Sequence, residues 1–163
     1  GHKKSLQTIG AANPRFQEGR QHTPIPNQKD KINQKRRKSN RMSAKKKILY
    51  VQTSGVDTPE RLYAPFILAA TAAAMGLDAT VYFVIKGITV VKKGAAEKVK
   101  IGQFPTLRQA MDQAIKAGVK LAVCEQSCML LDIGRGEFIS EAQIVGAATL
   151  NDLVLDADAV LCF

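Results

Sequence analysis

Residues 47–59 read K-I-L-Y-V-Q-T-S-G-V-D-T-P, and this stretch decides the fold class. Its first six residues are a short apolar, partly β-branched run that predicts a buried strand. A turn over 53–57 follows, and then the signals of a helix start: Asp57 or Thr58 as the N-cap and Pro59 in the first turn. A strand that passes directly into a helix is typical of proteins that alternate the two elements.

The same alternation continues to the last residue. After the first strand, the pattern predicts helices over 57–75, 106–117, from 125 and over 149–156, and strands over 78–85, 119–124, 142–146 and 159–163. Strand 142–146 is the ambiguous one, because Ser140 and Gln143 would also suit a helix start. For the basic segment 87–105 we expect a short extended piece at 88–91. Five apolar strands separated by helices predict an α/β fold with a mostly parallel sheet between two helical layers.

The positive charge is concentrated at one end of the chain. The net charge of the 163 residues is +10, but residues 1–47 carry 14 Lys and Arg against two acidic residues, whereas residues 48–163 are close to neutral. Residues 1–41 have the composition of a disordered basic extension. Two origins stay open for it: a native tail, or vector sequence or a mis-assigned start before Met42. A nucleic-acid or membrane partner is expected only if the tail is native, through the run 35–38.

Composition excludes several classes of protein. Three cysteines are too few for a disulfide scaffold, which favours a reducing cytoplasm. The longest uncharged stretch, residues 62–77, is shorter than the ~20 residues of a membrane span. Both histidines, His2 and His22, precede the predicted domain, so Cys-His and Ser-His nucleophilic sites are excluded there. No spacing of Cys and His suits a metal ion, and no nucleotide-binding fingerprint is present, so neither metal nor cofactor is expected.

Cys124 is the residue best placed for chemistry. In a parallel sheet, ligands bind beyond the carboxyl ends of the strands, and Cys124 stands where the third strand passes into a helix. The backbone N–H groups of Gln126 and Ser127 and the helix dipole would lower the pKa of this thiol and leave its sulfur exposed. Cys128, one turn later, is either a second, resolving thiol or a core residue. Cys162, inside the last strand, is expected to be buried and inert.

Two other strand ends contribute candidate binding residues. Thr53, Ser54 and Gly55 follow the first strand, and Gly87 follows the second. Such a turn holds an anion at a helix N-terminus or is an ordinary strand-to-helix connection. The lysines of residues 87–105 either attract anionic partners or belong to a solvated loop.

The chain from residue 46 to 163 resembles the DsrE/DsrF-like family of TusD-like sulfur-relay and related small proteins. The resemblance rests on an ordered set of motifs: K-K-I-L-Y-V-Q-T-S-G, G-I-T-V-V-K-K-G, A-G-V-K, V-C-E-Q-S-C, I-V-G-A-A-T-L-N-D-L and D-A-D-A-V-L-C-F. It implies a three-layer α/β/α sandwich around a five-stranded sheet, and trimers or hexamers that would bury the uncharged helix. It also implies that Cys124 accepts sulfane sulfur as a persulfide and passes it on, with donor and acceptor proteins as partners.

The sequence therefore indicates two candidate functions. The first is a cytoplasmic sulfur-trafficking protein, with or without sulfurtransferase activity, that acts through Cys124. The alternative is a non-catalytic oligomeric module that binds a small anion or nucleotide at the strand carboxyl ends.

Overall fold

A computed structural model describes residues 27–29, 31–32 and 44–163. The chain divides into two units, Gly1–Met42 and Ser43–Phe163. In the first unit, residues 28–29 and 31–32 are helical and exposed, and the predicted basic run 35–38 lies outside the described residues. In the second unit the secondary structure alternates as expected.

The second unit is built on one sheet of five strands, all parallel, in the order β4-β3-β2-β1-β5. This confirms the α/β class and goes beyond the expectation of a mostly parallel sheet. The strands are β1 (Lys47–Gln52), β2 (Asp78–Phe83), β3 (Lys120–Cys124), β4 (Ala142–Val145) and β5 (Ala159–Cys162). In register, Tyr82 of β2 lies beside Val51 of β1 and Ala122 of β3, so these three side chains share one face.

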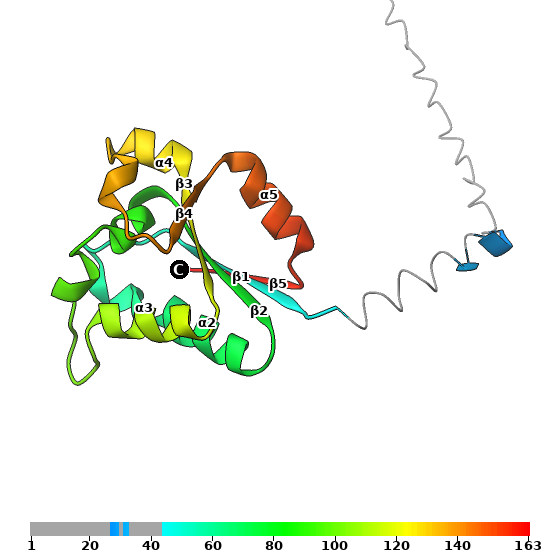
Figure 1. Ribbon diagram of the computed structural model, residues 1–163, viewed down its shortest axis with the longest axis horizontal. Coiled ribbons are helices and arrows are strands. Elements are labelled where there is room, and N and C mark those ends of the chain that lie inside the picture. Colours follow the sequence, from blue (N-terminus) through cyan, green and yellow to red (C-terminus); the bar gives the residue numbers. More distant parts are fainter. Residues whose placement is uncertain (1–26, 30, 33–43) are drawn as a thin grey trace, which may run out of the picture. The chain divides into compact units, whose positions relative to one another are not determined.

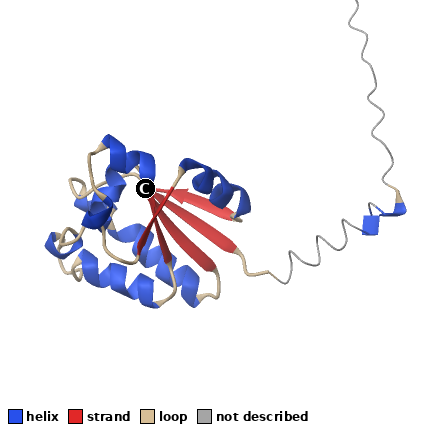
Figure 2. Cartoon of the chain, turned by 45° about the horizontal axis from the view of Figure 1, so that its top comes forward, coloured by secondary structure: helices blue, strands red, loops and turns tan. Residues whose placement is uncertain are grey.

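Helices cover both faces of the sheet (Figure 1). Helices α2 (Tyr63–Ala74) and α3 (Leu107–Lys116) pack on one face, and α5 (Ala147–Asp156) lies on the other. The short helix α4 (Glu125–Leu130) follows β3 without a loop. Figure 2 shows the same layers, with the strands in red between the helices. Within the described residues, no helix is both long and apolar enough to cross a bilayer.

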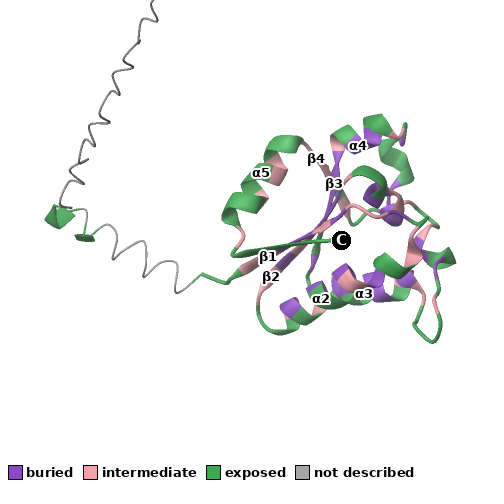
Figure 3. Cartoon of the chain, turned by 180° about the vertical axis from the view of Figure 1, so that it is seen from behind, coloured by how far each residue is buried: buried purple, intermediate pink, exposed green. Residues whose placement is uncertain are grey.

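The two faces of the sheet are buried to different extents (Figure 3). Most buried residues belong to the core beneath α2 and α3, which includes Phe66, Phe83 and Met111. The core beneath α5 is small: its buried members are Leu49, Tyr82, Ala122 and Cys124. Helix α5 itself has no buried residue. Helix α5 therefore buries less apolar surface against the sheet than α2 and α3 do.

Local signals placed several elements correctly. Thr106 and Gln109 form the predicted capping box at the start of α3. The ambiguous segment 142–146 is a strand, β4, which lies beside β3. The helix expected over 57–75 is divided, because a 3₁₀ helix (Pro59–Arg61) precedes α2.

Two predictions were wrong. Residues 88–91 are not extended: they belong to a 3₁₀ helix (Ile85–Val91) in which Ile88, Val90 and Val91 are fully buried. Its apolar side chains pack into the larger core, and this packing favours the compact conformation over an extended one. Some of its hydrogen bonds are local, such as Gly87 N–H to the Val84 carbonyl oxygen at 3.0 Å, whereas the Val91 carbonyl oxygen accepts from the Ile139 N–H at 3.0 Å. Helix α5 begins at Ala147 rather than Thr149, because the chain turns directly after β4 and Gly146 takes the N-cap position.

Candidate functional site

The candidate site is centred on Cys124, which is both the last residue of β3 and the N-cap of α4. The apolar run of β3 is buried up to this residue, and the chain then turns into α4 with no intervening loop. The Cys124 side chain lies on the α5 face of the sheet, in the small core with Leu49, Tyr82 and Ala122. The fold therefore holds the sulfur in apolar surroundings, at the edge where the strands end.

Burial and hydrogen bonding act in opposite directions on this thiol. Burial raises the pKa of Cys124. Interactions with hydrogen-bond donors lower it by more, and these donors are the Ser127 hydroxyl and N–H, the Tyr82 hydroxyl and the Gln126 N–H. The pKa therefore lies below the ordinary value for cysteine. The neutral thiol donates to Gln126 Oε1, with 3.6 Å between S and O. The predicted donors, Gln126 and Ser127, are thus beside the sulfur in this structure.

The hydroxyl of Ser127 is oriented by a neighbouring backbone group. The Ile85 N–H donates to Ser127 Oγ at 2.8 Å, which occupies a lone pair and leaves the hydroxyl proton free to point at another acceptor. Ile85 has a φ of 56°, a left-handed conformation that is unfavourable for a β-branched residue. Backbone strain of this kind is often found at functional sites, where the surrounding structure holds it in place.

Sequence reasoning missed Tyr82. This side chain is fully buried, and among the described residues its hydroxyl has no hydrogen-bond partner of normal geometry. Burial, together with the nearby Cys124 sulfur, raises the pKa of Tyr82, so the hydroxyl stays protonated. An unpaired buried hydroxyl costs about 1–3 kcal/mol. The strand D-A-T-V-Y-F carries three polar side chains on one face, Asp78, Thr80 and Tyr82, and the sequence alone does not show that this face also carries Cys124.

Cys128 has a different environment. It is 7% exposed, and its Sγ donates to the Cys124 carbonyl oxygen at 3.3 Å, one helical turn back. Burial, and then the charge of Cys124, raise the pKa of Cys128. Cys128 is therefore expected to ionise at a higher pH than Cys124.

The exposure of two cysteines differs from expectation. Cys124 is only 7% exposed, because β4 and α5 cover the strand end with Val145 and Leu150. Cys162 is exposed rather than buried, because β5 is an edge strand. No disulfide links the three cysteines, and the described residues contain no cluster of His, Cys, Asp and Glu that would hold a metal ion.

The other predicted binding residues make contacts away from the thiol. Thr53 donates from its N–H and its Oγ1 to the Phe163 carbonyl oxygen, at 2.7 and 2.6 Å. The Ser54 carbonyl accepts from the Gln52 amide at 2.7 Å. Gly55 and Gly87 are close-packing positions: a Cβ on Gly55 would lie 2.7 Å from the Lys86 carbonyl oxygen. These residues therefore hold neighbouring strand ends and the loops after them together.

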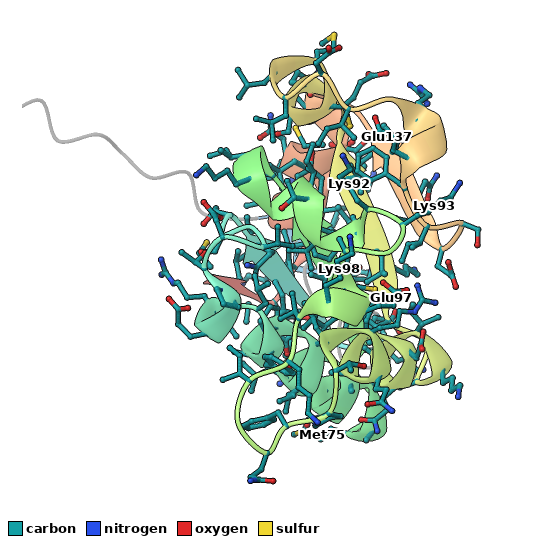
Figure 4. The ribbon with its side chains drawn as sticks, turned by 90° about the vertical axis from the view of Figure 1, so that its left-hand side faces the viewer. Met75, Lys92, Lys93, Glu97, Lys98 and Glu137 are labelled. Atoms are coloured by element: carbon teal, nitrogen blue, oxygen red, sulfur yellow. The ribbon has the colours of Figure 1, made fainter. Side chains whose placement is uncertain are left out.

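A separate cavity of about 540 Å³ lies beside the segment that follows β2. It is lined by Val56, Thr89, Lys92, Lys93, Gly94, Ala95, Lys98 and Val99. Figure 4 shows the three lysines with Glu137 close to Lys92. Lys92 pairs with Glu137 at 2.9 Å, and Lys93 donates to the Gly136 carbonyl oxygen at 2.6 Å. Part of the predicted basic segment 87–105 therefore lines this cavity.

Comparison with known proteins identifies the family. A sequence profile of the DsrE/DsrF-like family matches residues 46–163. The chain belongs to the DsrE/DsrF-like family. Its fold is similar to that of a solved structure, the ychN protein from E. coli, with a TM-score of 0.62, 22% identity, and coverage of 72% of this chain and 99% of the other.

Two curated proteins are similar in sequence. The sulfur carrier protein DsrE2 of Allochromatium vinosum is 28% identical over 156 residues, which cover 71% of this chain and 97% of that protein. The uncharacterized protein MJ0760 of Methanocaldococcus jannaschii is 30% identical over 102 residues, or 63% of this chain. This chain spans only 37% of the length of MJ0760.

Proposed function

We propose that this DsrE/DsrF-like protein is a sulfur carrier in which Cys124 receives sulfane sulfur as a persulfide and passes it to an acceptor. The observation that carries the proposal is the Cys124 sulfur at the end of β3, where hydrogen-bond donors bring the pKa of the thiol below its ordinary value despite burial. A thiolate is the form of cysteine that attacks sulfur, so this environment suits the reaction. The similarity to a sulfur carrier supports the same role.

Both half-reactions are exchanges at sulfur and need no external oxidant. In loading, the Cys124 thiolate attacks the outer sulfur of a donor persulfide, the S–S bond of the donor breaks, and the donor leaves as a thiolate. In delivery, an acceptor nucleophile attacks the outer sulfur on Cys124, and the electron pair of the broken bond returns to Cys124 Sγ. Cys128 is the neighbouring thiol available to condense with a sulfenic acid on Cys124, which forms a disulfide and releases water.

Partners and location follow from the same proposal. Sulfur transfer requires a donor and an acceptor protein, and three free thiols suit a reducing compartment, for which we propose the cytoplasm. We also propose a homo-oligomer, a trimer or hexamer, because α2 exposes Ile67 and Leu68, and Met75 directly after it is exposed as well. Exposed apolar side chains gathered on one helix mark an interaction surface.

Mass spectrometry tests the carrier function. The full chain is incubated with inorganic polysulfide, and peptides are mapped for an adduct of one sulfur atom. We expect the adduct on Cys124 in the wild type and its loss in Cys124→Ser, while the exposed Cys162 serves as an internal reference thiol. A Cys124 that stays unmodified while Cys162 is labelled would contradict the proposal.

The lysine-lined cavity favours a second candidate, the binding of a small anion. Lys92, Lys93 and Lys98 line this cavity. The cavity volume of about 540 Å³ is in the range of small-molecule sites. Thermal denaturation with added inorganic phosphate or a nucleotide separates the two functions. Anion binding predicts a raised melting temperature that persists in Cys124→Ser and is lost in Lys98→Ala. No shift in the wild type would exclude it.

A further inference from the structure

Tyr82 raises a question that packing alone does not answer. Its ring fills the small core beneath α5, and a phenylalanine ring would fill the same space. The hydroxyl is buried, and among the described residues it has no normal hydrogen-bond partner. Buried polar groups in folded proteins nearly always have partners, so an exception requires an explanation. The partially buried neighbours in this core are apolar, among them Val84, Val145 and Leu150.

Cys124 is the member of this core that can supply the missing partner. A neutral thiol already donates to Gln126 Oε1 and offers the Tyr82 hydroxyl only a weak acceptor. A thiolate is a strong acceptor, and hydrogen bonds to a charged group are about twice as strong as neutral ones. The apolar walls strengthen the interaction further, because they screen it little. The Tyr82 hydroxyl is therefore paired when the sulfur is charged and unpaired when it is not.

We propose that the hydroxyl groups of Tyr82 and Ser127 stabilise the negative charge that returns to Cys124 Sγ when sulfane sulfur is delivered. This inference rests on the proposed carrier function. In delivery, the bond between Sγ and the outer sulfur breaks and its electron pair stays on Sγ, so charge appears there in the transition state. Two hydroxyl groups beside that atom can stabilise the leaving thiolate with little reorganisation.

The arrangement also distinguishes delivery from loading. Donors that stabilise the thiolate make it a better leaving group, but they reduce its nucleophilicity, since nucleophilicity falls as a thiolate becomes less basic. Loss of the Tyr82 hydroxyl is therefore expected to slow delivery and, at a pH where Cys124 is ionised, to leave loading equal or faster. A residue that merely supports the fold would slow both half-reactions together.

The test uses Tyr82→Phe in the full chain, with Tyr50→Phe as the matched control. Tyr50 is also buried, but it lies on the opposite face of the sheet and donates to the Leu68 carbonyl oxygen at 3.2 Å. Each variant is loaded with polysulfide, freed of excess reagent and mixed with cyanide, which attacks the outer sulfur and leaves as thiocyanate. We expect single-turnover thiocyanate release to slow about tenfold in Tyr82→Phe and to be unchanged in Tyr50→Phe.

A second readout needs no sulfur transfer. The pH midpoint of Cys124 alkylation, followed by peptide mass spectrometry on unloaded protein, is expected to rise by about one unit in Tyr82→Phe and in Ser127→Ala. An unchanged release rate in a folded Tyr82→Phe overturns the inference. If the wild type never loads, the carrier function has failed and the delivery role with it. The alkylation midpoint then still decides whether Tyr82 holds charge on the sulfur.

Discussion

Two cysteines four residues apart in one chain have pKa values shifted in opposite directions. Hydrogen bonds lower the pKa of Cys124 despite its burial, whereas burial and the charge of Cys124 raise the pKa of Cys128. Cys124 therefore ionises first as the pH rises. We expect short pulses of iodoacetamide over a pH series to label Cys124 at lower pH than Cys128, as measured by peptide mass spectrometry.

Cys124→Ser is the control for this order. It removes the neighbouring charge but not the burial, so the labelling of Cys128 should move to lower pH without reaching that of a free thiol. Labelling of Cys128 before Cys124 in the wild type would show that the hydrogen bonds at the end of β3 do not outweigh burial.

Gly87 provides a prediction about stability. A Cβ at this position would lie 2.0 Å from the Gln52 carbonyl oxygen, which is a backbone atom at the end of β1 and has little freedom to move. We expect Gly87→Ala to lower the free energy of unfolding by about 1–3 kcal/mol in urea denaturation, as for other overpacked sites. Gly136→Ala is the control, because a Cβ there would meet no atom within 4 Å. Equal stability of the two variants would argue against the close approach.

How far the sequence predicted the site depends on which kind of contact is considered. Cys124, Gln126 and Ser127 were predictable because they are consecutive along the strand-to-helix junction, so local geometry brings them together. Tyr82 and Ile85 were not, because their proximity to Cys124 depends on the pairing of β2 with β3. The exposure of Cys162 depended on strand order, which places β5 at an edge.

Among the helices, α5 packs on the face of the sheet that carries the Cys124 thiol. It contributes Leu150 and Leu153 to the core around Cys124, yet none of its own residues is buried. Its C-terminal end is fixed by Lys47, which pairs with Asp156 and donates from its N–H to Asp158 at 2.8 Å. Loss of this ion pair should allow α5 to move away from the sheet more often and expose the Cys124 sulfur.

Asp156→Asn tests this idea. The substitution removes the ion pair with Lys47, and we expect Cys124 to be alkylated roughly two- to fivefold faster at fixed pH, in line with the modest strength of surface ion pairs. Asp152→Asn on the same helix is the control, because among the described residues the Asp152 carboxylate forms no ion pair. Equal rates in the two variants would mean that α5 does not limit access.

Helix boundaries show the same division between local and distant causes. The capping box of α3 lies within four residues and was predictable, whereas the start of α5 depends on how β4 ends against β3. Residues 88–91 were expected to be extended because they are β-branched. Their burial in the core beneath α2 and α3, which the sequence alone does not show, favours the 3₁₀ helix instead.

At the scale of the whole molecule, the outer side of α2 carries the expectation of a homo-oligomer. Ile67 and Leu68 are 43% and 41% exposed on a helix without a single charged residue. We expect analytical ultracentrifugation at tens of micromolar to show a species larger than one chain in the wild type, and a smaller one in Ile67→Glu.

Met129→Glu is the control for this measurement. Met129 is equally apolar and 72% exposed, but it lies on α4, away from the proposed interface. Dissociation by both variants would indicate nonspecific association through exposed apolar side chains. A wild type that sediments as a single chain would contradict the oligomer itself.

The alternation of side chains along β2 has a genetic consequence. Tyr82 points to one side of the sheet and its neighbour Phe83 to the other, and the two side chains differ by a single hydroxyl. Exchange of the two codons would keep an aromatic ring at each position and move that hydroxyl to the opposite face, away from Cys124. We expect such an exchange to be recognised most clearly by a genetic selection that follows the transported atom.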